Sequence, residues 1–181
     1  LPKDVYYMYQ SEWTKKEVLH LMPHWNWKKG DNVAVWCYYN NADYVELFLN
    51  GKSLGKSTKS DESLHAEWKV PFELGELKVV KYRGGKIVQE EIRHTAGEVA
   101  NVHFEVEHDK YAAGDATDLY FITVSLRDDK GSIVTDNDLE IEFSADNNCA
   151  VLGTDNGYQA DLQGLTRPIR KTFKGYAVGY I

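Results

Sequence analysis

The sequence predicts an all-β protein, with two β-sandwich domains in tandem behind one short helix. Three observations support this fold class. Apolar residues alternate with polar residues along most of the chain, which is the period of a strand. Turn sequences rich in Gly, Asn and Asp separate these runs at short intervals, as they do in β-sandwiches. The 181 residues are 43% hydrophobic and 13% aromatic with only 4 Pro, which favours strands around a packed core.

Residues 4–20 form the one segment with a helical pattern. Their apolar positions partly follow a period of 3.6 residues, with Lys15, Lys16 and Glu17 on the polar side. Pro23 cannot continue a helix, because its ring removes an N–H donor and clashes with the preceding turn. We therefore set residues 1–19 apart from the sandwich that follows. The apolar residues that carry the pattern are Val5, Met8, Tyr9, Trp13 and Leu19.

The first sandwich is predicted over residues 20–97. Both faces of residues 32–39 are apolar, so this strand should lie in the middle of its sheet and be covered on both sides. The dipeptide Asn50-Gly51 favours a two-residue hairpin turn, and it joins a strand at 44–50 to one at 52–57. The remaining strands of this domain are predicted at residues 64–70, 77–82 and 87–94.

The second sandwich is predicted over residues 98–181, after the short connector Ala96-Gly97-Glu98. Residues 119–127 are apolar on both faces and should form a central strand. Turns are expected at Asp128-Asp129-Lys130-Gly131 and at Asp155-Asn156-Gly157. The other strands of this domain are predicted at residues 102–106, 139–143, 149–152 and 174–181.

Composition excludes several classes of function. The net charge of −7 and the pI near 5.4 argue against binding to nucleic acid, which needs clustered Lys and Arg. No apolar run approaches the roughly 18 residues of a membrane helix. The chain begins Leu1-Pro2-Lys3, without a start Met or a signal peptide, so we expect a segment of a longer protein. Cys37 and Cys149 lie in apolar strand patterns, and we expect two buried free thiols.

The densest aromatic cluster lies at residues 19–27, which contain two His, two Trp and one Pro. His24, Trp25 and Trp27 are the candidate binding residues, for a glycan or for a domain interface. Flat indole rings can stack on the C–H faces of a sugar, whereas a Trp cluster between two domains commonly anchors their interface. His20 and His24 have the i, i+4 spacing of two metal ligands on a helix, but Pro23 between them disfavours that helix. No metal site is therefore assigned.

No carboxylate cluster has the pattern of a catalytic or cation site. The spacing of the aspartates around the turn at residues 128–131 does not fit an EF-hand loop, and we interpret them as solvated turn residues. Glu90-Glu91, Glu140 and Glu142 are expected at exposed strand positions, without a partner that would tune them for acid–base chemistry. No catalytic residue and no cofactor are predicted. The aspartates considered are Asp128, Asp129, Asp136 and Asp138.

Several blocks of sequence, taken in order, resemble family 2 glycoside hydrolases of the β-galactosidase type. Residues 2–13 resemble the final helix of the catalytic barrel of that family, and residues 20–27 resemble the connector that leaves the barrel. The hairpin at residues 45–55 resembles that of the first Ig-like domain after the barrel. The blocks that resemble the last Ig-like domain are residues 96–98, 118–124, 129–131, 155–157 and 170–175.

The resemblance implies two Ig-like β-sandwich domains, behind a remnant of the last barrel helix at residues 1–19. It also implies that the acid/base Glu and the nucleophile Glu of a retaining glycosidase lie on barrel strands upstream of Leu1. No catalytic residue is carried over to this chain, and the chain itself is expected to be inactive. The implied partner is the catalytic barrel of the same polypeptide, while carbohydrate and an oligomeric parent stay open. The resemblance further implies a location outside the cytoplasm.

Three functions are compatible with these observations. The first is a non-catalytic C-terminal region of a β-galactosidase-like enzyme, which braces the barrel and shapes substrate access. The alternatives are an independent carbohydrate-binding module and an Ig-like adhesion or scaffold fragment. The helix remnant favours the first over the third, because a stand-alone adhesin has no use for it. Binding of glycans by the chain would favour the second.

Overall fold

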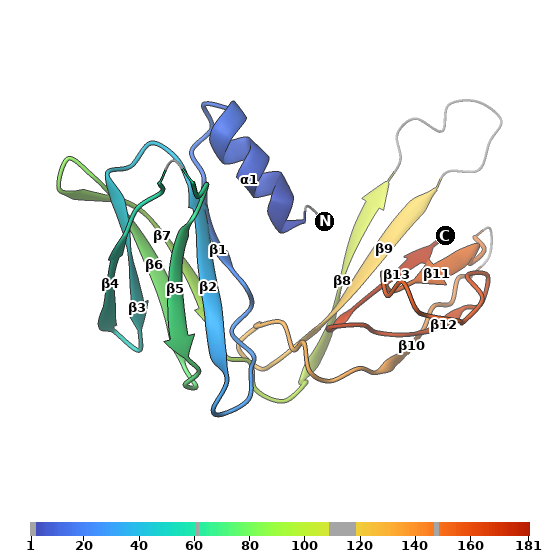
Figure 1. Cartoon of the computed structure of the whole chain (residues 1–181). Helices are drawn as coiled ribbons and strands as arrows, with labels where there is room; N and C mark the ends of the chain where they lie inside the picture. The colour runs from blue at the N-terminus through green and yellow to red at the C-terminus, as the bar shows by residue number, and fades with distance from the viewer. Residues whose placement is uncertain (1–2, 61, 109–118, 147–148) are drawn as a thin grey trace. The chain divides into compact units, whose positions relative to one another are not determined.

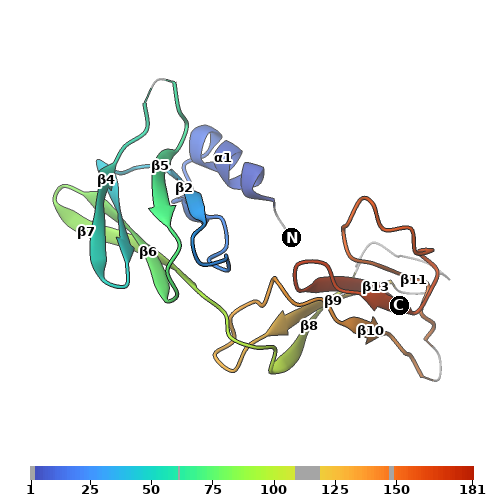
Figure 2. The same ribbon diagram turned by 60° about the horizontal axis from the view of Figure 1, so that its bottom comes forward.

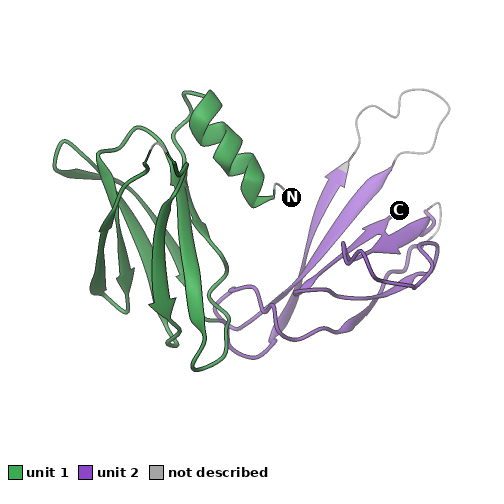
Figure 3. Ribbon diagram, viewed as in Figure 1, with its two compact units in different colours: residues 1–95 green, residues 96–181 purple. Residues whose placement is uncertain are grey.

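The computed structural model describes residues 3–60, 62–108, 119–146 and 149–181. The chain divides into two compact units, Leu1–Thr95 and Ala96–Ile181 (Figure 3). Each unit is built from antiparallel sheets, and one short helix precedes them. The predicted fold class, tandem Ig-like β-sandwiches behind a short helix, is confirmed. The finer three-part division, with residues 1–19 set apart and a boundary between residues 97 and 98, stays a prediction.

The first unit is a sandwich of two sheets, and the helix α1 (Asp4–Trp13) lies beside β1 and β2 (Figures 1 and 2). One sheet has the order β1-β2-β5 and the other has the order β4-β3-β6-β7. The strands of the first sheet are β1 (Leu19–Met22), β2 (Asn32–Tyr39) and β5 (Ala66–Pro71). The strands of the second sheet are β3 (Tyr44–Leu49), β4 (Lys52–Ser57), β6 (Glu76–Arg83) and β7 (Lys86–His94).

Alternate residues of these strands build the core of the first unit. β2 lies in the middle of its sheet, as predicted, and its odd-numbered residues are buried. The predicted cover on both sides is incomplete, because Asn32 and Ala34 on the other face are exposed. The partner sheet contributes the alternate residues of β3 and β6, so the two inner faces close on one another. The strand residues in this core are Leu19, Leu21, Val33, Val35, Cys37, Tyr39, Val45, Leu47, Leu49, Ala66, Trp68, Val70, Leu77 and Val79.

The predicted Asn50-Gly51 hairpin is present between β3 and β4. Both residues have a positive φ, 51° and 79°, which is what a type I′ turn requires. The Asn50 side chain also donates to the carbonyl of Leu74 at 3.0 Å and accepts from the N–H of Glu76 at 2.9 Å. Gly75 packs so tightly here that a Cβ would lie 1.9 Å from Oδ1 of Asn50. The turn is thereby fixed to the segment that enters β6.

The helix predicted over residues 4–20 is too long, because α1 ends at Trp13 and residues 19–22 form β1. Contacts distant in sequence decide this end. The N–H of Val18 donates to Oδ1 of Asn40 at 2.9 Å, and β1 then pairs with β2. Pairing buries the side chains of Leu19 and Leu21 in the core, and that gain outweighs a local helical preference of a few tenths of a kcal/mol per residue.

The second unit has a four-stranded sheet of order β11-β13-β9-β8 and a two-stranded sheet of β10 and β12. β9 lies between two neighbours, as predicted for residues 119–127. Phe143 packs on the backbone of Gly179, where a Cβ would lie 2.4 Å from the ring. The strands are β8 (Asn101–His108), β9 (Tyr120–Arg127), β10 (Glu140–Glu142), β11 (Gly153–Asp155), β12 (Ile169–Lys171) and β13 (Tyr176–Tyr180).

Two predictions for the second unit were wrong at residues 149–152. This run forms no strand, because β11 begins only at Gly153, and Cys149 is exposed. Val151 alone of the run packs against the core, while Leu152 is exposed. A short apolar run without alternation does not distinguish a buried strand from a loop that contributes one side chain.

Asp128 is a buried structural residue, in contrast to the predicted solvated turn aspartate. Asp128 is only 2% exposed. Its carboxylate oxygens accept hydrogen bonds from the N–H groups of Gly97, Lys130 and Ser132 at 2.9, 3.0 and 2.7 Å. These donors favour the charged form and hold the pKa of Asp128 below its usual range. The carboxylate thus closes the turn at residues 128–131 and is not free to bind a cation.

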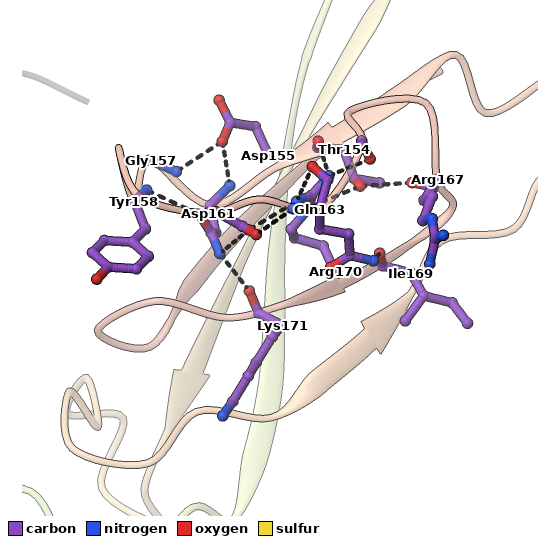
Figure 4. A network of polar contacts seen from close by, with 12 residues as sticks. Thr154, Asp155, Gly157, Tyr158, Asp161, Gln163, Arg167, Ile169, Arg170 and Lys171 are labelled. Atoms are coloured by element: carbon purple, nitrogen blue, oxygen red, sulfur yellow. Dashed lines mark hydrogen bonds and ion pairs between the residues drawn. The ribbon is translucent and has the colours of Figure 1, made fainter.

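Arg170 organises the loop between β11 and β12 (Figure 4). It is fully buried, and its guanidinium donates to the carboxylate of Asp161 at 2.8 Å and to the hydroxyl of Thr154 at 3.1 Å. It also donates to the carbonyls of Thr154, Gln163 and Gly164. A buried Arg is tolerated only when its donors are satisfied in this way. We therefore interpret the Arg170 network as structural.

The two thiols should differ in reactivity. Burial raises the pKa of Cys37 to about 12, whereas Cys149 is exposed. Because the thiolate is the reactive form, a disulfide reagent such as DTNB should modify one thiol promptly in the native chain and the second only after unfolding. The measurement is thiol release with and without guanidinium, with Cys149→Ser as the control. Two prompt thiols in the native protein would contradict this assignment.

Candidate functional site

The three candidate binding residues lie on the connector between β1 and β2, but they are not equivalent. Trp25 is 1% exposed and belongs to the core of the first unit, where its ring contacts Phe72 at 5.3 Å between centroids. Its indole N–H donates to the carbonyl of Glu73 at 3.0 Å. A side chain buried in this way has no face free for a sugar or for another domain. It acts as a core residue of its own sandwich.

Trp27 lies at the surface, only two residues further on. It is 40% exposed, its indole N–H donates to the carbonyl of His24 at 2.9 Å, and its ring stacks on the His24 imidazole at 5.1 Å. Trp27 and Pro23 border a hollow of about 420 Å³ whose other lining residues come from the turn and the start of β2. For His24 and Trp27 the predicted binding role therefore stays a prediction.

His20 lies on β1, whereas His24 lies on the connector that follows β1. Its Nε2 lies 2.8 Å from Oδ1 of Asp4, and its ring stacks on Tyr7 at 3.8 Å. The pair does not form the metal site considered above. Across the part of the chain that the structure describes, no group of three or more His, Cys, Asp or Glu could hold a metal ion.

A buried cation that the sequence analysis missed fixes the segment between α1 and β1. Lys81 is fully buried, and its Nζ donates to Oε2 of Glu17 at 2.6 Å and to the carbonyl of Val18 at 3.1 Å. Arg83 donates to the other carboxylate oxygen of Glu17 at 2.7 Å. Hydrogen bonds from these two cations lower the pKa of Glu17 to about 2. The signal was available, since Lys81 shares its strand face with Leu77 and Val79.

Side chains of β7 form hydrogen bonds to the backbone of β1 at its free edge. Glu91 accepts from the N–H of Leu21 at 2.9 Å, and Arg93 donates to the carbonyl of the same residue at 2.8 Å. Glu91 and Arg93 are also paired with each other. Glu91 was predicted to be exposed without a partner, and that prediction is wrong. Its role is to satisfy an edge strand, which otherwise offers unpaired backbone groups to other chains.

The helix α1 presents its more apolar stripe to solvent. Its inner side is held to the first unit by Asp4 and Tyr7, which contact His20, and by an ion pair between Glu12 and Lys59. The predicted amphipathic helix thus exists, but its apolar stripe does not face the sandwich. The outward residues are Val5, Tyr6, Tyr9 and Trp13, which are 48%, 46%, 45% and 78% exposed.

Both units match known protein families. Residues 98–181 match the glycoside hydrolase family 2 C-terminal domain 5, and residues 30–89 match a domain of unknown function, DUF4982. The chain is 45% identical over 174 residues to the beta-galactosidase BoGH2A of Bacteroides ovatus. The chain belongs to the family 2 glycoside hydrolases. It corresponds to their C-terminal domains, as the resemblance implied.

The same family 2 architecture appears in solved structures. A beta-glycosidase from Bacteroides vulgatus aligns with a TM-score of 0.84 and 31% identity, over 99% of this chain and 23% of that one. A family 2 glycosyl hydrolase from Bacteroides cellulosilyticus aligns with a TM-score of 0.86 and 28% identity, over 98% of this chain and 27% of that one. The match to the Bacteroides ovatus enzyme covers 96% of this chain and 20% of that protein. The chain therefore spans about a fifth of the length of this curated relative.

Glu17 should contribute to stability in a pH-dependent way. Its pKa is lowered from 4.5 to about 2, so its contribution is present above pH 4.5 and is lost as the pH falls toward 2. Glu17→Gln should lower the free energy of unfolding at neutral pH by about 1–2 kcal/mol, because a buried amine loses a charged acceptor that is itself half exposed. Urea unfolding at pH 7 and pH 3 measures this loss, which should shrink at pH 3. Glu90→Gln, at an exposed position of β7, is the control and should change neither value.

Substitution of the two connector tryptophans should lower the free energy of unfolding by different amounts. Trp25→Ala leaves a cavity in the core and should lower the free energy of unfolding by about 3–5 kcal/mol. Trp27→Ala removes a surface ring and should cost less than about 1 kcal/mol. Guanidinium unfolding of both variants measures the difference. Equal losses of unfolding free energy would show that the exposed Trp27 ring also contributes to the packing of the core.

Proposed function

We propose that this chain is a non-catalytic C-terminal region that braces the catalytic barrel of a family 2 glycoside hydrolase and shapes access to its active site. The observation that carries the proposal is the outward stripe of α1. An apolar patch of four neighbouring side chains at a protein surface commonly marks an interaction site. The region of the relatives that lies outside this chain supplies a partner within the same polypeptide.

The attachment of α1 supports a bracing role. His20 stacks on Tyr7 and pairs with Asp4, while Lys59 pairs with Glu12, so the helix is fixed to the first sandwich on one side. A helix fixed on one side and apolar on the other transmits the position of one domain to the next. Docking of this stripe on the barrel would hold the first sandwich at the barrel, where it can border the path of a substrate.

The hydrogen-bond partners of four carboxylates support a non-catalytic role. A general acid or base needs a carboxyl group that can reach a substrate and exchange a proton. Glu17, Glu91, Asp128 and Asp161 are instead engaged by cations or backbone N–H groups. Each holds its own segment of chain in place.

The stretches of chain that the structure describes contain no helix long and apolar enough to cross a membrane.

Substitutions on α1 test the proposal. Tyr9→Ser and Trp13→Ser should leave the melting temperature of the 181-residue chain nearly unchanged, because both rings are exposed in it. In the full-length enzyme the same changes should lower the melting temperature by several degrees, because each removes a buried ring from the domain interface. Thermal unfolding of each variant and of its unsubstituted parent, followed by scanning calorimetry, measures both effects.

A matched control separates docking from general surface effects. Leu74 is 74% exposed, much like Trp13, but it lies in the loop before β6 and outside the α1 stripe. Leu74→Ser should leave both the chain and the full-length enzyme unchanged. If the α1 variants shift the full-length enzyme no more than Leu74→Ser does, the stripe makes no domain contact and the bracing proposal fails.

A further inference from the structure

We infer that the hollow beside Trp27 is a carbohydrate-stacking subsite, which takes a pyranose ring with a contiguous C–H face. The hollow has a volume of about 420 Å³, within the range of small-molecule sites of about 300–1,000 Å³. It is lined by one exposed aromatic ring, by apolar side chains and by two polar side chains. The lining residues are Pro23, Trp27, Asp31, Asn32, Val33 and Ala34.

The aromatic platform of this subsite is held in one orientation. One face of the Trp27 ring is backed by His24, whose imidazole lies within 15° of parallel, and its indole N–H is bonded to the carbonyl of His24. Trp27 stays 40% exposed with His24 stacked on it, so part of the residue is available to a ligand. A ring fixed before binding loses little conformational freedom when a sugar stacks on it.

Two polar side chains stand beside the platform, Asp31 on a hydrogen-bonded turn and Asn32 at the start of β2. Oδ2 of Asp31 accepts from the N–H of Lys28 at 2.9 Å, and the N–H of Asp31 donates back to the Lys28 carbonyl at 3.0 Å. The turn passes through Gly30 at a φ of 98°, which favours glycine. Asn32 follows on the exposed side of β2. A carboxylate and an amide next to an aromatic face can bond the hydroxyl groups at the edge of a pyranose.

The chemistry of the hollow favours a sugar over a protein surface. The α1 stripe shows what an apolar docking face looks like in this chain, with four large side chains in a row. The hollow instead combines one ring with two hydrogen-bonding groups in a concave surface, which matches the amphipathic shape of a pyranose. This inference does not depend on the bracing proposal, since the two surfaces share no residue.

The test uses the 181-residue chain labelled with ¹⁵N at the indoles, titrated with methyl β-D-galactopyranoside. The indole resonance of Trp27 should shift and saturate, while that of the core residue Trp25 stays in place. Sorbitol, which carries hydroxyl groups but no ring face, is the control and should shift neither resonance. A flat Trp27 titration up to the solubility limit of the glycoside, or equal shifts with sorbitol, would overturn the inference.

Variants locate the binding, with saturation transfer to the galactoside as the readout. Trp27→Ala should weaken association by at least about tenfold, and Trp27→Phe by less, since a smaller ring still stacks. Asn32→Ala should weaken it about threefold to tenfold without lowering the melting temperature. Trp13→Ala, at a more exposed indole on α1, is the matched control and should leave binding unchanged. If Trp13→Ala weakens binding as much as Trp27→Ala, the subsite assignment is wrong while the bracing proposal stands or falls on its own test.

Discussion

The architecture of the first unit depends on one buried charge. Lys81 stands in line with Leu77 and Val79 on the inner face of β6, where an unpaired ammonium group would cost several kcal/mol. Its Nζ therefore recruits the carboxylate of Glu17 and the carbonyl of Val18. These contacts fix the chain just after α1 and just before β1. Together with the hydrogen bond from the Val18 N–H to Asn40, they hold the chain between the helix and the strand in place.

The connector that follows β1 enters the core of the first unit. The short edge strand β1 and its side-chain partners hold the start of this connector in place. β1 has only four residues, and its outward backbone groups at Leu21 are satisfied by Glu91 and Arg93 of the opposite sheet. Closure at this edge brings the chain past Pro23 and sends Trp25 inward, where it fills the space beside Phe72. The next turn returns to the surface, so Trp27 faces solvent.

Local patterns predicted the strands well, because alternation reports which side chains face a core whatever the topology. The Asn50-Gly51 turn and the central position of residues 32–39 follow from residues that are neighbours in sequence. Two of the predictions that were wrong depend on distant contacts. The helix ends where it does because of Asn40, which is 22 positions beyond Val18. Asp128 accepts a hydrogen bond from Gly97, 31 positions earlier, as well as from two residues of its own turn.

The candidate site was harder to predict than the fold, for a related reason. An irregular connector has no period, so nothing in its sequence assigns Trp25 to the core and Trp27 to the surface. Buried charges are similarly ambiguous, because polar residues on strands are usually exposed. Lys81 could have been recognised from its position two residues after Val79. Glu91 and Arg93 could not, because their partner is the backbone of Leu21, which the sequence analysis placed in the connector and not in a strand.

The orientation of α1 is the feature that the stability of this chain alone does not explain. A helix of ten residues is marginal in water, and burial of its apolar face is what normally stabilises such a helix. Here the buried side relies on an imidazole stack, a histidine–aspartate pair and a lysine–glutamate pair, while the aromatic stripe stays outside. Turning the stripe inward would bury more apolar area against the sandwich. An aromatic stripe that stays on the outer side is the arrangement expected of a helix that docks on a second surface, as in the bracing role proposed above.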